Sequence, residues 1–311
     1  MSNANFRRKI ALISTILLFA IILPIITDVR WHLVMNLICL NAVAALSLYF
    51  IAILGMVSFA QAGFYGLGSY TVSILLLGTK IPFWIAWITG GVVAVVVAWL
   101  IGLVVLKIKG AYFFLVTLAL NQFLVWIFHS WKSLTGGYTG LYGVPAPSLI
   151  DSPGKLYYLS LALLLGLFLY ILSIQNSRLG PILRANHENE TMIQSYGISP
   201  FRIKMTNWIT CCFFTGLAGG INAILINSSY PTMFDMGTSL RWLVFLVFGG
   251  MVSPIGPIIG SGILTMVSEF LRPVKQLEPL VYGSVLLLII ILLPGGLLNL
   301  FKKLFKRSGL P

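Results

Sequence analysis

The chain has 311 residues, of which 59% are hydrophobic and only 9% are charged. A soluble protein has about 25% charged residues, because its core needs a solvated shell. This composition therefore excludes an ordinary soluble fold and predicts an integral membrane protein. The net charge of +13 does not indicate nucleic-acid binding. The lysines and arginines stand singly or in short runs between apolar stretches, as they do in the loops and tails of membrane proteins.

A membrane-spanning helix needs about 20 mostly apolar residues. The stretches that meet this requirement are 10–27, 33–53, 60–78, 83–106, 111–130, 156–174, 206–228 and 280–299. The first of them follows three basic residues, but it is long and lacks a small-x-small cleavage pattern. We therefore interpret it as a retained span rather than a signal peptide.

A ninth apolar region, 241–271, is interrupted by Gly249-Gly250 and then by Pro254, Gly256 and Pro257. Backbone groups that such a break leaves free must be satisfied by protein or water, since lipid offers no partner. We expect a broken or re-entrant element here, and the fold class is all-α with about eight transmembrane helices plus this element. The region also contains a short internal repeat, because the sequence Gly-Met-Val-Ser occurs at 55–58 and again at 250–253.

The orientation follows from the basic residues. If the N-terminus is inside and 241–271 enters and leaves on one side, thirteen of the 20 lysines and arginines lie inside. The positive-inside rule favours this arrangement, which places both termini in the cytoplasm. We expect a single transmembrane domain over 1–311, with an outer loop at 131–155 and a cytoplasmic loop at 175–205.

The cytoplasmic loop is the longest polar segment. Residues 183–196 are predicted to form one short helix that carries Arg184, His187, Glu188 and Glu190 and ends at Gly197 as its C-cap. Such a helix suits docking onto a soluble partner. An ordinary solvated loop helix is an equally good interpretation.

The chain lacks the motifs of a phosphate loop, a zinc protease or a serine hydrolase,. His32, His129 and His187 are isolated, so no metal site is predicted. Glu269 and His129 lie near span ends, where an interfacial position is the better interpretation than an ion relay. An intramembrane enzyme is therefore poorly supported, and either an external energy source drives transport or the chain is a passive channel. Cys39, Cys211 and Cys212 lie in apolar runs and are interpreted as packing residues.

Several polar residues lie inside apolar sequence. They are Ser58, Gln61, Thr117, Asn121, Gln122, Asn222 and Asn227. Each can form a hydrogen bond between helices, and the set can also line a hydrated path. With Gly63 and Phe64 of the glycine-rich stretch 55–70, the residues Ser58, Gln61, Thr117, Asn121 and Gln122 are our candidates for a translocation pathway.

Six segments in order resemble the LivM-type permeases of ATP-binding-cassette importers for branched-chain amino acids. They are SFAQAGFYGLGSY (58–70), GAYFFLVTLAL (110–120), LTGGYTGL (134–141), SRLGPILRANHENETMIQSYGI (177–198), GGMVSPIGPIIGS (249–261) and the Pro-x-Gly-Leu pattern at 294–297. The chain departs from the family where Met192 and Ile193 replace a small pair, Pro181 and His187 replace arginines, and Gln61 stands in place of a frequent histidine.

The resemblance implies a multi-pass protein of the cell (inner or plasma) membrane that moves its substrate by alternating access. It implies that loop 175–205 is the coupling loop, with Glu188, Glu190 and Gly197 in the docking pattern. The implied partners are ATPase subunits that bind the ATP, a second permease subunit of the LivH type, an extracytoplasmic substrate-binding protein and membrane lipid. No cofactor is expected on this chain. An importer for urea, short amides or another amino acid is the first alternative, and a stand-alone channel or secondary carrier is the second.

Overall fold

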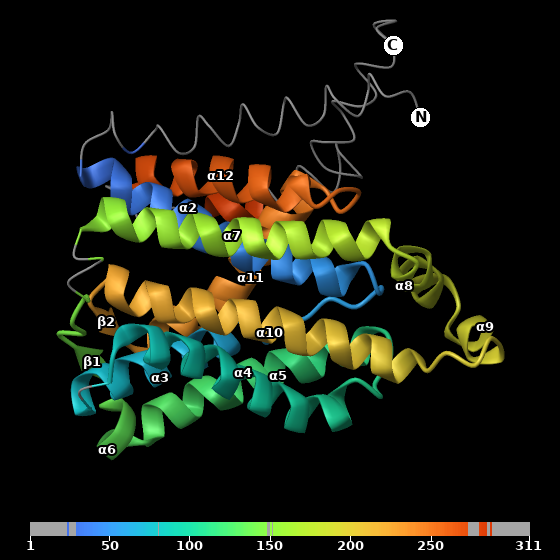
Figure 1. Cartoon of the computed structure of the whole chain (residues 1–311), viewed down its shortest axis with the longest axis horizontal. Helices are drawn as coiled ribbons and strands as arrows, with labels where there is room; N and C mark the ends of the chain where they lie inside the picture. Colours follow the sequence, from blue (N-terminus) through green and yellow to red (C-terminus); the bar gives the residue numbers. More distant parts are fainter. Residues whose placement is uncertain are drawn as a thin grey trace, which may run out of the picture.

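The computed structural model describes Pro24, residues 29–79, 81–147, Ile150, 152–272, 280–284 and Leu287. The helices are α2 (Val29–Ala52), α3 (Gln61–Gly78), α4 (Phe83–Val105), α5 (Ala111–Ser130), α6 (Lys132–Thr135), α7 (Pro153–Asn176), α8 (Leu179–Glu188), α9 (Glu190–Ser195), α10 (Pro200–Leu225), α11 (Met236–Gly249) and α12 (Ile255–Phe270), with a 3-10 turn at Pro231–Phe234. The long helices lie side by side (Figure 1). The end that carries α8 and α9 is called the α8–α9 face, and the end that carries β1 (Leu141–Tyr142) and β2 (Ser228–Ser229) is called the strand face.

Five helices, α2, α4, α5, α7 and α10, are long and apolar enough to cross a membrane. They confirm the predicted spans at 33–53, 83–106, 111–130, 156–174 and 206–228. The predicted span 60–78 is also a helix, α3, whose first ten residues are nearly all buried inside the bundle. The predicted span 10–27 and most of 280–299 lie outside the described residues.

Helix α10 forms the centre of the bundle and packs against α2, α3 and α4. Glycines allow α3 and α10 to touch along their backbones. A Cβ on Gly68 would lie 1.9 Å from the carbonyl oxygen of Gly216, and a Cβ on Gly219 would lie 1.9 Å from that of Tyr65. Small residues at helix contacts are the usual means of close packing in membranes. The cysteines at 39, 211 and 212 are buried and free, which agrees with their interpretation as packing residues.

The region 241–271 is broken as predicted. It forms α11 and α12, separated by residues 250–254 and packed against each other. Their 14 and 16 residues correspond to about 21 and 24 Å, whereas the hydrocarbon layer is about 30 Å thick. The hairpin is tight, since a Cβ on Gly249 would lie 1.9 Å from the carbonyl oxygen of Gly256. The two copies of the Gly-Met-Val-Ser repeat both lie between two helices. Each begins with a glycine of positive φ, +76° at Gly55 and +101° at Gly250.

A two-stranded antiparallel sheet closes the strand face. Leu141 pairs with Ser229 and Tyr142 with Ser228. The hydroxyl of Ser229 also lies 2.6 Å from that of Ser69 and 2.8 Å from that of Ser73, both on α3. The segment predicted as the outer loop, 131–155, is thereby fixed to the ends of α10 and α3.

Candidate functional site

The glycine-rich stretch 55–70 contains a break between two helices. Residues 53–60 leave the helical conformation after α2, and α3 then begins at Gln61. The first N–H groups of a helix have no partner within the helix. In an apolar bundle each of them needs an acceptor from elsewhere in the protein.

Side chains of two other helices supply these acceptors. On α5, the Thr117 hydroxyl accepts a hydrogen bond from the Phe59 N–H at 3.1 Å, and Asn121 Oδ1 accepts one from the Gly63 N–H at 2.6 Å. On α11, the hydroxyl of Ser239 accepts from the Ala62 N–H at 3.1 Å. It also donates to the Phe59 carbonyl oxygen at 2.7 Å. The break is therefore held from both sides by neighbouring helices.

The structure brings most pathway candidates together at this break, where they are buried. The Ser58 hydroxyl accepts from the Ala60 N–H at 3.2 Å, and Gln61 Oε1 accepts from the Thr215 hydroxyl at 3.0 Å. Phe64 is fully buried and packs edge-on against Trp208. The amide nitrogen Nε2 of Gln61 is buried without a hydrogen-bond partner.

Gln122 is the exception among these candidates, because it lies on the exposed side of α5 and not at the break. Asn121, its neighbour, also donates from Nδ2 to the Phe234 carbonyl oxygen at 3.2 Å. Its amide is therefore engaged on both sides. Among the buried candidates, the side chains of Ser58, Thr117 and Asn121 accept from backbone N–H groups at the break. Gln122 instead lies on the outer surface of the bundle.

Residues 183–196 do not form the single helix that the sequence predicted. The chain forms α8 and α9 instead, separated at Asn189, whose φ and ψ are −158° and 103°. Asn189 Oδ1 accepts from the N–H groups of Thr191 and Met192 at 3.0 and 3.3 Å, so this residue caps α9. Asparagine is among the preferred N-caps, and here the cap prevails over helix continuation.

The end of α9 agrees with the prediction. Gly197 has a φ of +74°, its N–H donates to the Gln194 carbonyl oxygen at 2.9 Å, and the Ile198 N–H donates to that of Ile193 at 3.3 Å. This pair of hydrogen bonds is the Schellman arrangement, which needs a left-handed residue and favours glycine.

Glu190 lies between two lysines. Its Oε2 is 2.9 Å from Lys109 Nζ, in the connection between α4 and α5, and its Oε1 contacts Lys204 Nζ on α10. The Lys204 side chain is only 5% exposed. Desolvation raises the pKa of Glu190, but the hydrogen bonds from Lys204 and Lys109 outweigh it and hold the pKa below the ordinary value. Glu190 thus ties the loop to the ends of the spans.

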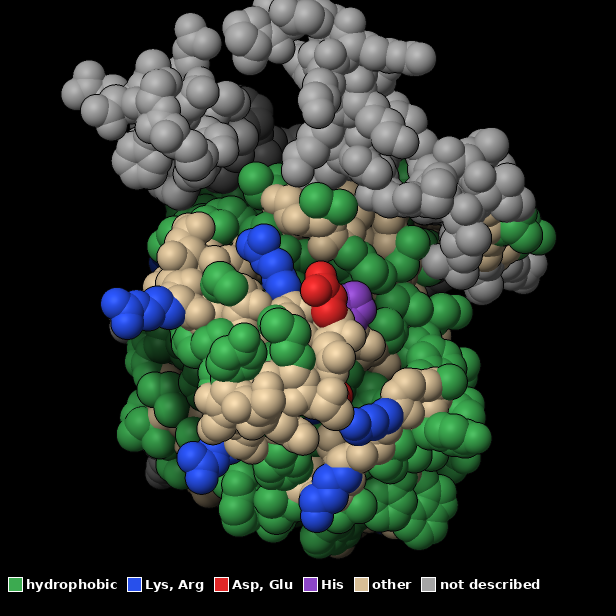
Figure 2. Space-filling model, turned by 90° about the vertical axis from the view of Figure 1, so that its right-hand side faces the viewer, with side chains coloured by type: hydrophobic (Ala, Val, Ile, Leu, Met, Phe, Trp, Pro, Cys, Tyr) green, Lys and Arg blue, Asp and Glu red, His purple; other side chains and the backbone are tan. Residues whose placement is uncertain are grey.

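Three further predicted coupling residues have exposed side chains. Arg184, His187 and Glu188 are exposed on α8. The His187 ring covers Gly55, where a Cβ would lie 2.2 Å from the ring carbon Cδ2. Figure 2 shows the α8–α9 face, on which lysine and arginine side chains surround an acidic side chain beside a histidine. The loop therefore presents charged side chains outward and contacts the break after α2.

A shallow apolar hollow of about 270 Å³ lies between α8 and α9. It is lined by Pro181, Ile182, Ala185, Met192, Ile193, Tyr196 and Ile198. Met192 and Tyr196 are 53% and 73% exposed. Large apolar side chains exposed together outside the spans are typical of a protein-docking surface.

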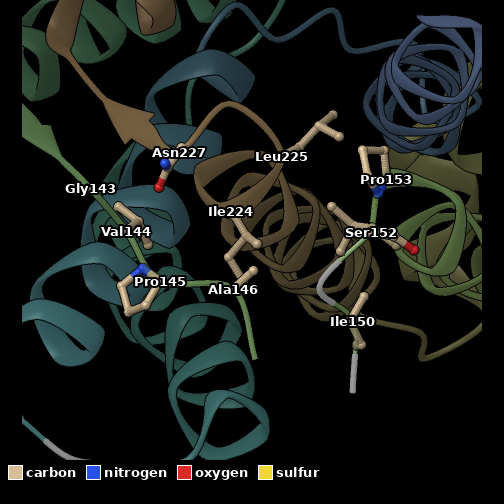
Figure 3. A pocket seen from close by; sticks show the side chains of 11 residues that line it. Gly143, Val144, Pro145, Ala146, Ile150, Ser152, Pro153, Ile224, Leu225 and Asn227 are labelled. Atoms are coloured by element: carbon tan, nitrogen blue, oxygen red, sulfur yellow. The ribbon is translucent and has the colours of Figure 1, made fainter. Parts of the chain in front are cut away.

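A second cavity, of about 340 Å³, lies at the strand face. Figure 3 shows segment 143–146 on one side of it and Ser152 and Pro153 on the other, with Ile224 between them. The Ser152 hydroxyl caps α7 by accepting from the Lys155 N–H at 3.4 Å. Asn227 also lines the cavity, and the other lining residues are apolar or glycine. Within the described residues, no three His, Cys, Asp or Glu side chains are grouped so that they could hold a metal ion.

Comparison with known proteins identifies the family. Residues 32–294 match the family model described as branched-chain amino acid transport system / permease component. The chain belongs to this family. No solved structure matches it.

The relatives of this permease agree with that membership. It is 28% identical to the high-affinity branched-chain amino acid transport system permease protein LivM of Salmonella typhimurium, over 87% of its own length and 68% of the relative's. The Escherichia coli LivM protein is 27% identical over the same shares. A probable branched-chain amino acid transport permease protein LivH of Methanocaldococcus jannaschii is 27% identical over 51% of this chain and 53% of that protein.

Three residues of the site escaped the sequence reasoning. Lys109 and Lys204 are two of the thirteen basic residues that the sequence places on the inner side, and nothing further was predicted for them. Ser239 is not among the predicted candidates. A lysine five residues into a helix that continues as an apolar span is the signal that could have singled out Lys204, because a buried lysine needs an anionic partner. Ser239 gave no local signal.

Proposed function

We propose that this chain is one membrane-spanning permease subunit of a binding-protein-dependent, ATP-driven importer for branched-chain amino acids. The observation that supports this most is the family match over 32–294. The structure adds a loop that is anchored to the spans through Glu190 and presents an apolar hollow outward. The α8–α9 face is then cytoplasmic, and the strand face meets the substrate-binding protein.

The coupling step follows from this geometry. An ATPase subunit docks on the hollow between α8 and α9, and its motion moves the loop. Since Glu190 contacts Lys109 and Lys204, the motion reaches the start of α5 and of α10 directly. The His187 ring on Gly55 gives a second contact, at the break before α3.

The translocation path lies between this chain and a second permease subunit. The side chains of Ser58, Thr117 and Asn121 at the break are engaged with the backbone. Gln122, in contrast, is exposed near the middle of α5. A polar side chain at that depth is unfavourable against lipid. It is better explained by a partner helix or a hydrated path along the exposed side of α5.

Uptake by the reconstituted complex tests this function. Proteoliposomes that contain the chain with its co-purifying partner subunits are supplied with radiolabelled leucine, the substrate-binding protein and internal ATP. We expect uptake that stops when either ATP or the binding protein is omitted. ATP-dependent uptake of urea or amides but not leucine would contradict the substrate, and flux through this chain alone without ATP would contradict the mechanism.

A further inference from the structure

A third pocket, of about 360 Å³, lies beneath the loop at the α8–α9 face. Its walls come from four separate parts of the chain. These are Leu54–Met56 after α2, Ile108–Gly110 before α5, Asn186–Thr191 of the loop and Lys204 on α10. The volume lies at the lower end of the range of about 300–1,000 Å³ that is usual for small-molecule sites.

Asn186 is the residue that points to a ligand. It is 2% exposed, it lines the pocket, and neither its amide oxygen nor its amide nitrogen has a hydrogen-bond partner. Buried polar groups in proteins are nearly always hydrogen-bonded, so an unpaired amide needs an explanation. A ligand that satisfies both atoms must offer an acceptor to Nδ2 and a donor to Oδ1.

The charges around the pocket are mixed and balanced. Lys109 and Lys204 supply two positive charges, and Glu188 and Glu190 supply two negative ones. The Lys109 side chain is 68% exposed, so it can turn toward a ligand, whereas Lys204 is fixed inside the protein. A simple anion would meet both carboxylates and a simple cation would meet both ammonium groups. A zwitterion avoids both conflicts.

The remaining wall is apolar. Leu54 and Met56 are buried there, and Ile108 lies beside them. Carboxylate, ammonium and a hydrocarbon side chain occur together in an aliphatic α-amino acid. We propose that this pocket binds an aliphatic zwitterionic amino acid on the cytoplasmic side and that its occupancy slows transport.

The effect on transport follows from the position of the pocket. A molecule held between the loop, the α4–α5 connection and the start of α10 opposes any movement of the loop relative to the spans. Product that accumulates inside the cell would therefore lower the rate of further import. This inference rests on the proposed function, since it takes the imported substrate to be the inhibitor.

The test uses the complete transporter, the chain with its co-purifying partner subunits, in lipid nanodiscs with L-leucine as the probe. ATP hydrolysis is stimulated by binding protein that is saturated with leucine. The concentration of free leucine is then raised further. We expect the rate to fall, and Asn186→Leu to require about tenfold more leucine for the same fractional fall, because both hydrogen bonds to the ligand are lost. Gln194→Ala, an exposed change on α9 outside the pocket, is the matched control.

Two further measurements keep the outcome clear. Asn186→Leu removes an unpaired buried amide, so its Tm is expected to rise or stay level. If Asn186→Leu misfolds, Lys109→Gln serves as a second variant, in which inhibition by leucine is also expected to weaken. Isocaproate and isoamylamine, which keep the side chain but lack one charge each, are expected to inhibit far less than leucine.

Inhibition by leucine that is equal in wild type, Asn186→Leu and Lys109→Gln would overturn the inference, as would isocaproate that matches leucine. ATP-dependent leucine uptake in proteoliposomes, together with ATP hydrolysis in nanodiscs that leucine does not inhibit, overturns this inference alone. Absence of ATP-dependent leucine uptake in the wild type overturns the proposed function instead.

Discussion

At the scale of single residues, the contact of Glu190 with Lys204 involves a buried charge. Lys204 is almost wholly buried, and a buried ammonium group without a partner is costly. Glu190→Gln is expected to lower the free energy of unfolding by about 2–3 kcal/mol, somewhat below the full cost of breaking a buried pair because Glu190 itself is partly exposed,. Thermal unfolding of the purified complex measures this loss.

The double variant Glu190→Gln/Lys204→Met separates charge from packing. If the loss comes from an unpaired ammonium group, removing that group restores most of the stability. Glu188→Gln, an exposed change on the same loop, is expected to leave the Tm unchanged. A Glu190→Gln variant as stable as wild type would show that Lys109 and Lys204 do not depend on this carboxylate.

The same pair predicts how stability depends on pH. The pKa of Glu190 is lower in the folded protein than its ordinary value of 4.5. Its stabilising contribution is therefore complete above that value and is lost as the pH falls through the lower, folded-state pKa. The Tm difference between wild type and Glu190→Gln should stay constant from pH 7 to about 5 and shrink below pH 4.5,. A difference that already shrinks between pH 7 and 6 would contradict this assignment.

At the scale of elements, the start of α3 depends on acceptors that are distant in sequence. Asn121 lies 58 positions from Gly63, and Ser239 lies 177 positions from Ala62. Asn121→Leu leaves the Gly63 N–H without an acceptor in an apolar bundle. We expect it to lower the free energy of unfolding by about 1–3 kcal/mol. Gln122→Leu, the neighbouring exposed position, should change it little, and equal losses in both variants would refute this role of Asn121.

These distances explain what the sequence could and could not predict. Where the structure describes the predicted spans, the apolar runs located the helix ends to within six residues, because a span must be long and apolar. The glycines and prolines located the break in 241–271. The sequence could not show that Thr117 and Asn121 serve the α3 backbone, since that depends on which spans are neighbours. It also missed the break at Asn189, where a capping side chain competes with a pattern that otherwise favours one helix.

At the scale of the whole molecule, the residues on the exposed side of α5 bear on whether that side faces lipid or a partner. Tyr112, Leu115 and Trp126 are 73%, 56% and 63% exposed there, and Gln122 lies among them at helical spacing. Gln122 is the twelfth of the 20 residues of α5, so it lies near the middle of the span. Because lipid at that depth offers no hydrogen bonds, this side of α5 is where we propose that the second permease subunit and the path between the two subunits lie.

A bulky substitution tests that assignment. Gln122→Trp is expected to reduce ATP-dependent leucine uptake by at least about tenfold without lowering the Tm, because the Gln122 side chain is exposed,. Leu100→Trp, on the exposed side of α4 where Leu100 is 55% exposed, is the matched control and should transport normally if α4 faces lipid. If Gln122→Trp transports at the wild-type rate and Leu100→Trp does not, the path runs along α4. If both variants transport normally, neither exposed side lines the path, and the unpaired amide nitrogen of Gln61 becomes the starting point for a path inside the chain.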